Sequence, residues 1–112
     1  MSDGIIITID MVIKPELGEA VRAGIPAMME DTPKFKGFRS IRVVQHEDDP
    51  NHLLIVEHWD TKEDYAAYNA FRNRDGGQDK AMTALLSYKN DAWPGLIGFK
   101  SNDPSKGDAP AA

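Results

Sequence analysis

The sequence predicts an α+β fold in which four antiparallel strands carry helices on one face. Runs rich in β-branched residues indicate strands, apolar residues at helical spacing follow the first and third runs, and a short polar loop joins the second run to the third. The chain has 112 residues, of which 41% are hydrophobic and 28% charged. This length and composition are typical of one globular domain, which we place at residues 1–100.

The N-terminal part of the chain is predicted to form a strand and then a helix. Ile5–Ile13 is rich in β-branched residues, and both of its alternating sets of side chains are largely apolar, as in a strand covered on both faces. Pro15 suits the first turn of a helix that we expect to run to Glu30. Because Pro26 cannot donate a hydrogen bond to the carbonyl of Arg22, this helix is expected to kink or restart there.

A β-hairpin and a second helix are predicted in the middle of the chain. Residues 38–46 and His52–Trp59 have the composition of strands, and the short polar loop EDDPN separates them. Thr61 and Asp64 have the spacing of a helix start, and this helix should reach about Arg72.

The C-terminal part is predicted to hold a further helical segment and a last strand. Asp75, Gly76 and Gly77 interrupt the second helix, and residues 79–87 are expected to resume it. A short strand is expected at residues 96–100, and residues 101–112 are predicted to be a disordered tail.

The predicted order β-α-β-β-α-β is the ferredoxin-like arrangement, in which both helices cover one face of a four-stranded antiparallel sheet. The other face is left bare. Because the first and third strands are apolar on both sides, this bare face would expose a large hydrophobic patch. We therefore expect a homodimer joined through the sheet faces, with two-fold symmetry.

Charge and composition exclude several classes of partner. The net charge is −5 and the 13 Lys and Arg residues are scattered, so nucleic acid is not an expected partner. No apolar run is long enough to cross a membrane, and the N-terminus has no secretory signal, so a cytoplasmic location is expected. With no cysteine, a thiolate nucleophile and cysteine-ligated metals are excluded.

Three stretches carry a family resemblance: VIKPELGEA after the first strand, KGFRSIRVVQHEDDPN through the hairpin, and VEHWDTKEDYAAY at the second helix. Over residues 5–86 the chain resembles the antibiotic biosynthesis monooxygenase superfamily of dimeric α+β barrels. The resemblance implies a cofactor-independent monooxygenase that oxidises a phenolic, anthrone-like or quinol small molecule with dioxygen. Two alternatives stay open on the same dimeric fold: an isomerase or polyketide-cyclase-like enzyme, and a non-catalytic binding protein.

The resemblance implies three aromatic catalytic candidates. Trp59 matches the family tryptophan at the end of the third strand, and Tyr65 matches a pocket tyrosine of an anthrone-oxidising member. Tyr68 stands where many members have histidine, so a proton shuttle there would be phenolic. Ile55 replaces the asparagine of the anthrone-type pocket. The residues by themselves also allow Trp59 and Tyr65 to be ordinary core aromatics.

Four further residues are candidates for binding the substrate. Arg72 shares one side of the predicted helix with the two tyrosines, and Asn69 lies beside that stripe or is exposed. Asp10 and His58 each lie inside a strand among apolar neighbours, where an ionisable group must be hydrogen-bonded, shifted in pKa or turned to solvent. His58 is also a candidate for joining the two subunits.

Three other polar residues are assigned structural roles. Glu57 is expected to anchor local backbone or an arginine such as Arg42 across the hairpin. His46 and His52 flank the hairpin loop near several carboxylates, but a solvated loop is expected and no metal site is predicted. The haem-degrading branch of the superfamily needs a histidine on the second helix, and the sequence has none after Trp59.

Overall fold

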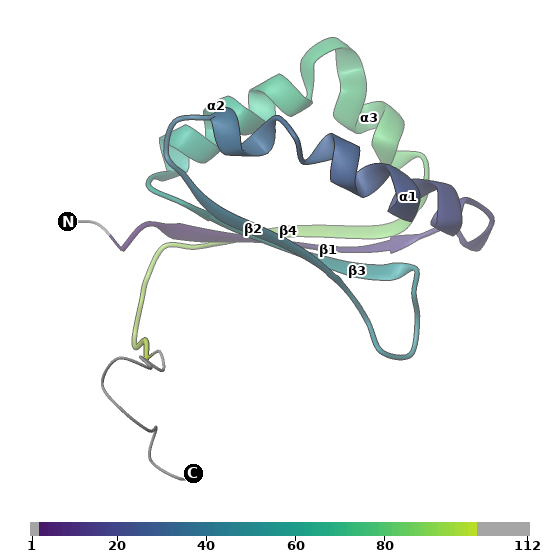
Figure 1. The fold of residues 1–112 in the computed structure, drawn as a ribbon, viewed down its shortest axis with the longest axis horizontal. Coiled ribbons are helices and arrows are strands. Elements are labelled where there is room, and N and C mark those ends of the chain that lie inside the picture. Colours follow the sequence, from purple (N-terminus) through teal and green to yellow (C-terminus); the bar gives the residue numbers. More distant parts are fainter. Residues whose placement is uncertain (1–2, 101–112) are drawn as a thin grey trace, which may run out of the picture.

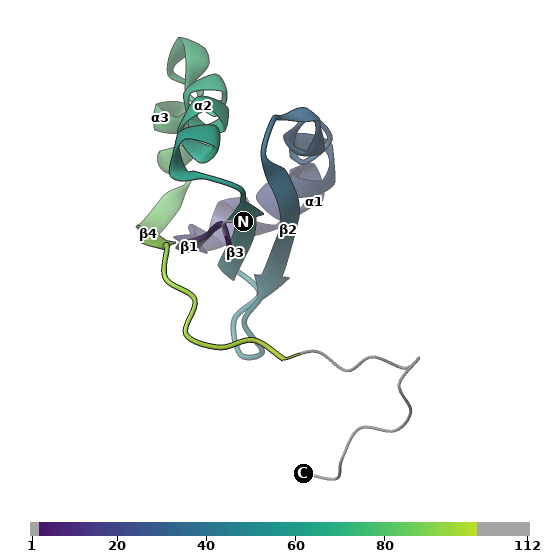
Figure 2. The same cartoon turned by 90° about the vertical axis from the view of Figure 1, so that its left-hand side faces the viewer.

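The computed structural model describes residues 3–100, which form a four-stranded sheet with three α-helices on one face (Figure 1, Figure 2). The strands are β1 (Ile5–Ile13), β2 (Phe38–Gln45), β3 (His52–Trp59) and β4 (Leu85–Trp93), and the helices are α1 (Gly18–Met28), α2 (Lys62–Arg72) and α3 (Gly77–Met82). Neighbouring strands are antiparallel, in the order β2-β3-β1-β4. The predicted ferredoxin-like α+β fold is confirmed, whereas the predicted tail at residues 101–112 lies outside the described residues.

Strand β1 lies inside the sheet because it has a partner strand on each edge. It pairs with β3 from Ile5 opposite Trp59 to Val12 opposite His52, and with β4 on its other edge. The side chains of β1 that point under the helices are mostly buried: Ile5, Ile7, Met11 and Ile13. Their removal from water is a main contribution to the packing of the helices on the sheet.

The helix boundaries follow from identifiable residues. A 3₁₀ turn, Pro15–Leu17, precedes α1, and α1 then continues through Pro26 to Met28 without a restart. Because Pro26 lies in the last turn of α1, the helix loses only one hydrogen bond there. The Thr61 hydroxyl accepts a hydrogen bond from the backbone N–H of Asp64 at 3.0 Å, which confirms the predicted start of α2.

The connection between α2 and α3 is a sharp turn. Asp75 and Gly76 have φ values of 58° and 71°, in the left-handed region that ends a right-handed helix. The predicted interruption of the helix is therefore confirmed, and the turn places α3 beside α2 on the same face of the sheet (Figure 1).

The C-terminal part of the sheet corrects two predictions. Helix α3 ends at Met82 and β4 spans Leu85–Trp93, so the helix predicted over residues 79–87 is too long. Residues 96–100 have no regular structure, and the strand predicted there is wrong. The sequence LLSYKNDAW has no β-branched residue, and it forms a strand because the free edge of β1 supplies its backbone partners.

The face of the sheet that the helices leave uncovered carries both apolar and ionisable side chains. Leu54, Val44 and Trp93 are 36%, 49% and 56% exposed. Asp10 and His58 lie on the same face, because they occupy alternate positions to the residues buried under the helices. The bare face is therefore less uniformly hydrophobic than the sequence analysis expects.

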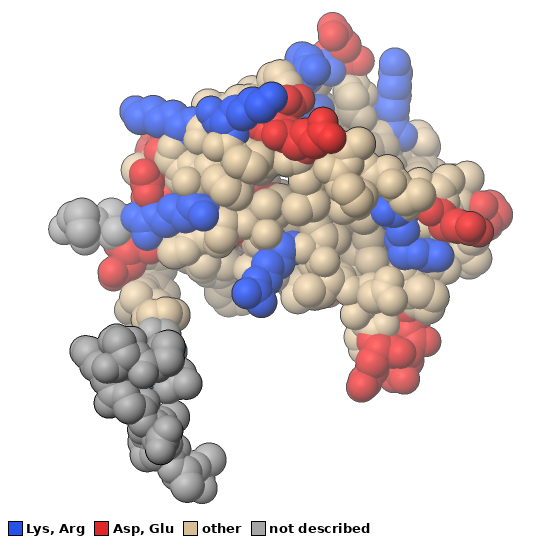
Figure 3. Space-filling model, in the orientation of Figure 1, with Lys and Arg blue, Asp and Glu red and all other residues tan. Residues whose placement is uncertain are grey.

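Charged side chains are spread unevenly over the surface. In Figure 3 the Lys and Arg residues are dispersed over the visible face, and acidic residues gather at the hairpin loop, residues 47–49. Within residues 3–100, no helix is both long and apolar enough to span a membrane.

Candidate active site

A pocket of about 390 Å³ is lined by residues of α1, α2, α3 and the sheet. Figure 2 shows α1 on one side and α2 with α3 on the other, above the sheet. A volume of this size accommodates a small organic ligand. Among the predicted site residues, Tyr65, Tyr68, Asn69 and Arg72 line the pocket. The other three, Trp59, His58 and Asp10, are absent from the lining.

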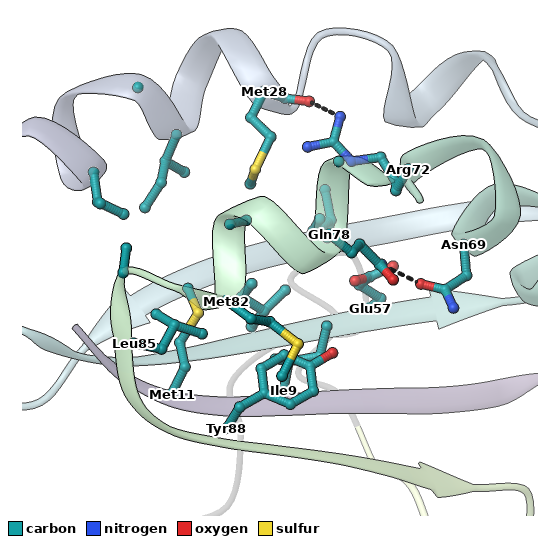
Figure 4. Close-up of a pocket in the computed structure, with 18 of the residues that line it drawn as sticks. Ile9, Met11, Met28, Glu57, Asn69, Arg72, Gln78, Met82, Leu85 and Tyr88 are labelled. Carbon is teal, nitrogen blue, oxygen red and sulfur yellow. Dashed lines mark hydrogen bonds between the residues drawn. The ribbon is translucent and has the colours of Figure 1, made fainter. Parts of the chain in front are cut away.

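The polar and apolar residues of the pocket are segregated (Figure 4). Glu57, Asn69, Arg72 and Gln78 lie together at one end, which we call the polar end. The other end, which we call the apolar end, is lined by Met11, Met82 and Leu85 (Figure 4), and by Val21 and Ile25, which belong to the same hydrophobic cluster as Met11 and Leu85. The pocket is therefore suited to a ligand with one polar edge and an apolar body.

Glu57 places a carboxyl group in the floor of the polar end. It lies on β3 in the inward-facing row between Ile55 and Trp59, and it is only 3% exposed. Its Oε1 accepts a hydrogen bond of 2.9 Å from the indole Nε1 of Trp59. Burial raises the pKa of the Glu57 carboxyl, while this hydrogen bond and the positive charge of Arg72 oppose the rise. A carboxylate with a raised pKa is a stronger proton acceptor than an exposed one.

Tyr65 and Tyr68 line the pocket from α2, and their hydroxyls have different partners. The Tyr65 hydroxyl accepts a hydrogen bond of 2.9 Å from Asn90 of β4, and burial raises its pKa to about 12. The Tyr68 hydroxyl lies 2.9 Å from the hydroxyl of the fully buried Thr32, and burial raises its pKa also. Both phenols therefore remain protonated near neutral pH, and Tyr65 keeps its own proton for donation.

Arg72 and Asn69 complete the polar end from α2. The Arg72 guanidinium donates one hydrogen bond, from Nη1 to the backbone carbonyl of Met28, 3.2 Å away on α1. The Asn69 side-chain oxygen accepts a hydrogen bond from Gln78 of α3. Asn69 is half-buried and not exposed, and its NH₂ group stays available to a ligand.

Trp59 lies behind the pocket and is fully buried. Its ring packs against Tyr68, Phe38 and Tyr65, with centroid distances of 5.0, 5.5 and 6.2 Å. Its indole N–H holds the Glu57 carboxylate. The structure therefore gives Trp59 contact with three pocket residues, Glu57, Tyr65 and Tyr68, and no open face on which a ligand ring could stack.

Asp10 and His58 are separated from the pocket by the thickness of the sheet. The Asp10 carboxylate lies 2.8 Å from Nε2 of His52 on the bare face, and the His52 ring stacks on His46 at 5.2 Å. His58 Nε2 lies 2.9 Å from the backbone oxygen of Asp3. These contacts belong to the bare face, so neither residue can contact a ligand in the pocket.

The sequence analysis missed the part played by Glu57. Glu57 was predicted to anchor local backbone or an arginine such as Arg42, but the observed partner of its carboxylate is the indole of Trp59, because both side chains point to the helix-covered face. The available signal was a single carboxylate in the inward row between Ile55 and Trp59. Gln78 of α3 and Tyr88 of β4 gave no such signal. The last helical segment was predicted at residues 79–87 and the last strand at residues 96–100, so neither residue was placed in its element.

Within the described part of the chain, no group of three or more His, Asp or Glu residues has the arrangement of a metal site. What the pocket combines is a buried carboxylate, protonated phenols and a cation beside an apolar chamber. This combination can remove a proton from a bound ligand and stabilise the resulting anion.

Comparisons with known proteins point to one family. The family model described as "Antibiotic biosynthesis monooxygenase" matches residues 4–80. No curated protein matches the sequence. Solved structures similar to this chain include a "putative antibiotic biosynthesis monooxygenase" of Deinococcus radiodurans, with a TM-score of 0.76 and 18% identity over 88% of this chain and 99% of that one. A protein of the same description from Nitrosomonas europaea has a TM-score of 0.72 and 18% identity, over 87% of this chain and 94% of that one. At such identities the similarity establishes the fold alone.

Proposed function

The chain belongs to the antibiotic biosynthesis monooxygenase family, and from this premise we propose that it is a cofactor-independent monooxygenase of phenolic, anthrone-like or quinol compounds. The observation that carries the proposal is Glu57, a carboxyl group 3% exposed at the floor of a ligand-sized pocket. Cofactor-free oxidation begins with removal of a proton, and a buried carboxylate with raised pKa is the group best placed to accept it.

For an anthrone-like methylene, the proposed reaction balances without an external reductant. Glu57 accepts a proton from the substrate, and the anion transfers one electron to dioxygen. The two radicals combine into a peroxide, to which Glu57 returns the proton. Loss of water from the peroxide then gives the carbonyl, so one oxygen atom enters the product and the other enters water. The methylene carbon supplies all four electrons.

Other residues in and behind the pocket serve the same step. Arg72 and the protonated hydroxyl of Tyr65 stabilise negative charge as it forms on the substrate oxygen. Trp59 is a positioning residue, because it acts through its hydrogen bond to Glu57. The apolar end holds the ring system and excludes water.

We also propose a homodimer joined through the bare faces of two sheets. Exposed apolar side chains on that face, including Leu54, Val44 and Trp93, support this assembly. The Asp10–His52 and His58 contacts would then lie at the subunit boundary. Sedimentation equilibrium at micromolar concentration tests the proposal, and a monomer at these concentrations contradicts it. A cytoplasmic location stays a prediction from the sequence.

Oxygen uptake with anthrone and with 1,4-dihydroxynaphthalene tests the proposed activity, using chelator-treated protein and correcting for spontaneous oxidation. We expect uptake of one dioxygen per anthrone without accumulation of hydrogen peroxide. If no anthrone or quinol consumes oxygen faster with the protein than without it, the monooxygenase assignment fails.

Tyr65→Phe separates an enzyme from a binding protein. The phenylalanine keeps the ring in the pocket and removes the donor, so we expect turnover to fall while ligand binding is retained. A proton-transfer isomerase remains the alternative enzyme, because a buried carboxylate and a phenol serve that reaction as well. Substrate conversion under nitrogen identifies it.

A further inference from the structure

The described lining of the pocket contains one acidic and one basic side chain that are not hydrogen-bonded to each other. Among the described lining residues, Glu57 and Arg72 are the charged ones, and both lie at the polar end (Figure 4). The positive charge of Arg72 acts on Glu57, but the two form no ion pair within the described residues. When Glu57 holds a proton, the polar end therefore carries a net positive charge.

Most of the N–H donors of Arg72 are not used in the contacts described. A guanidinium offers five N–H donors in a planar fork, and the Met28 carbonyl takes a single one of them among the contacts described. The hydrogen bond to the backbone of α1 restrains the guanidinium of the half-buried Arg72 at the polar end of the pocket. A restrained, half-buried guanidinium is suited to binding a carboxylate through two parallel hydrogen bonds.

The neighbouring amides extend this site. The Asn69 oxygen accepts a hydrogen bond from Gln78, which leaves the Asn69 NH₂ group as a further donor within the polar end. Met82 and Leu85 line the apolar end, and the volume of about 390 Å³ is large enough for a ligand with fused rings.

From this arrangement we propose that the substrate is an aromatic hydroxy acid of two or three fused rings. Its carboxylate binds Arg72, and its hydroxyl lies on the same edge of the ring system, facing Glu57. The inference rests on the proposed function for the role of Glu57, but the carboxylate preference concerns binding alone.

The test compares the binding of three ligands without turnover. We propose calorimetry under nitrogen with 3-hydroxy-2-naphthoic acid, its methyl ester and 2-naphthol. The acid should bind at least about tenfold more tightly than either neutral ligand, since a charge-assisted bidentate contact commonly supplies that factor. Arg72→Gln should reduce the acid to the affinity of the ester, and Arg72→Lys should recover part of the difference.

Arg74→Gln is the matched control. Arg74 lies two residues from Arg72, is exposed, and its guanidinium stacks on Phe71 at 3.8 Å, away from the pocket lining. The acid preference should survive this change. Equal affinity of acid and ester in the natural protein, a preference that persists in Arg72→Gln, or no measurable binding of the acid overturns the proposal.

The same ligands distinguish failure of this inference from failure of the proposed function. If the protein binds the acid selectively but accelerates oxygen uptake with no substrate, the proposed ligand class stands and the proposed monooxygenase activity is rejected. Oxygen uptake with neutral anthrones, without any preference for the acid, retains the monooxygenase and rejects the ligand class.

Discussion

The two faces of the sheet hold similar ionisable residues in different environments. On the helix-covered face, Glu57 is 3% exposed, bound by the Trp59 indole, and has a raised pKa. On the bare face, the Asp10 side chain is 51% exposed and pairs with His52 at 2.8 Å. Glu57 and His58 are adjacent in sequence but point to opposite sides. Whether an ionisable residue in a strand can take part in chemistry in the pocket therefore depends on which face of the sheet it occupies.

The largest expected effect is a loss of turnover when Glu57 on the helix-covered face is replaced. Glu57→Gln keeps the oxygen that accepts from Trp59 but removes the proton acceptor, so turnover should fall about 10²- to 10⁴-fold. Oxygen uptake at saturating substrate measures the loss, and thermal unfolding verifies that the variant is folded. Turnover within a factor of about three of the natural protein would remove Glu57 from the mechanism.

A smaller effect, on stability, is expected when Trp59 of the aromatic cluster is replaced. Trp59→Phe removes the N–H donor to a buried carboxylate and leaves a gap in the aromatic cluster, so unfolding free energy should fall by about 1–3 kcal/mol. Urea denaturation measures this change.

The same substitution should alter the pH profile. Because the Trp59 hydrogen bond lowers the pKa of Glu57, losing it should move the acid limb of the kcat/KM profile to higher pH. An acid limb at the same pH in both proteins would show that Trp59 has no influence on the proton acceptor.

The pH dependence of stability should reflect the covered face. The folded-state pKa of Glu57 is raised above its usual 4.5, so its contribution to stability is fully present below pH 4.5 and is lost as pH rises through the folded pKa. The natural protein should therefore lose more stability than Glu57→Gln as the pH rises above 4.5. Parallel stability curves for the two proteins would contradict the raised pKa.

The smallest expected effect lies on the bare face. Asp10→Asn should leave turnover within about twofold of the natural value, because Asp10 has the sheet between itself and the pocket. Oxygen uptake under the conditions used for Glu57→Gln makes the comparison direct. A loss as large as that of Glu57→Gln would mean that the two faces share one site.

Much of the fold could be predicted because local chemistry and tertiary context agree. The β-branched run of β1 and the Thr61 cap of α2 each specify their own element. Strand β4 could not be predicted, since LLSYKNDAW has no strand composition and depends on pairing with β1. That pairing is a long-range contact between segments more than 70 residues apart, and local patterns do not report it.

The candidate site was predictable on α2 and less so elsewhere. The helical spacing of Tyr65, Tyr68 and Arg72 places all three in the pocket lining, as one helix side requires. Trp59 was expected at the pocket edge, but which side of an aromatic cluster stays open depends on packing and not on sequence spacing. The positions of Asp10 and His58 could not be predicted, because the composition of the strands does not show which face the helices cover.

The matched family model ends at residue 80, and part of the pocket wall comes after it. Ala81, Met82, Ala84, Leu85 and Tyr88 all line the pocket from this later segment. Glu57 and Arg72 of the polar end lie inside the matched region, whereas Met82 and Leu85 of the apolar end lie outside it. Substitutions in the short segment 81–88 would therefore change the shape of the apolar end and leave the positions of Glu57 and Arg72 unchanged.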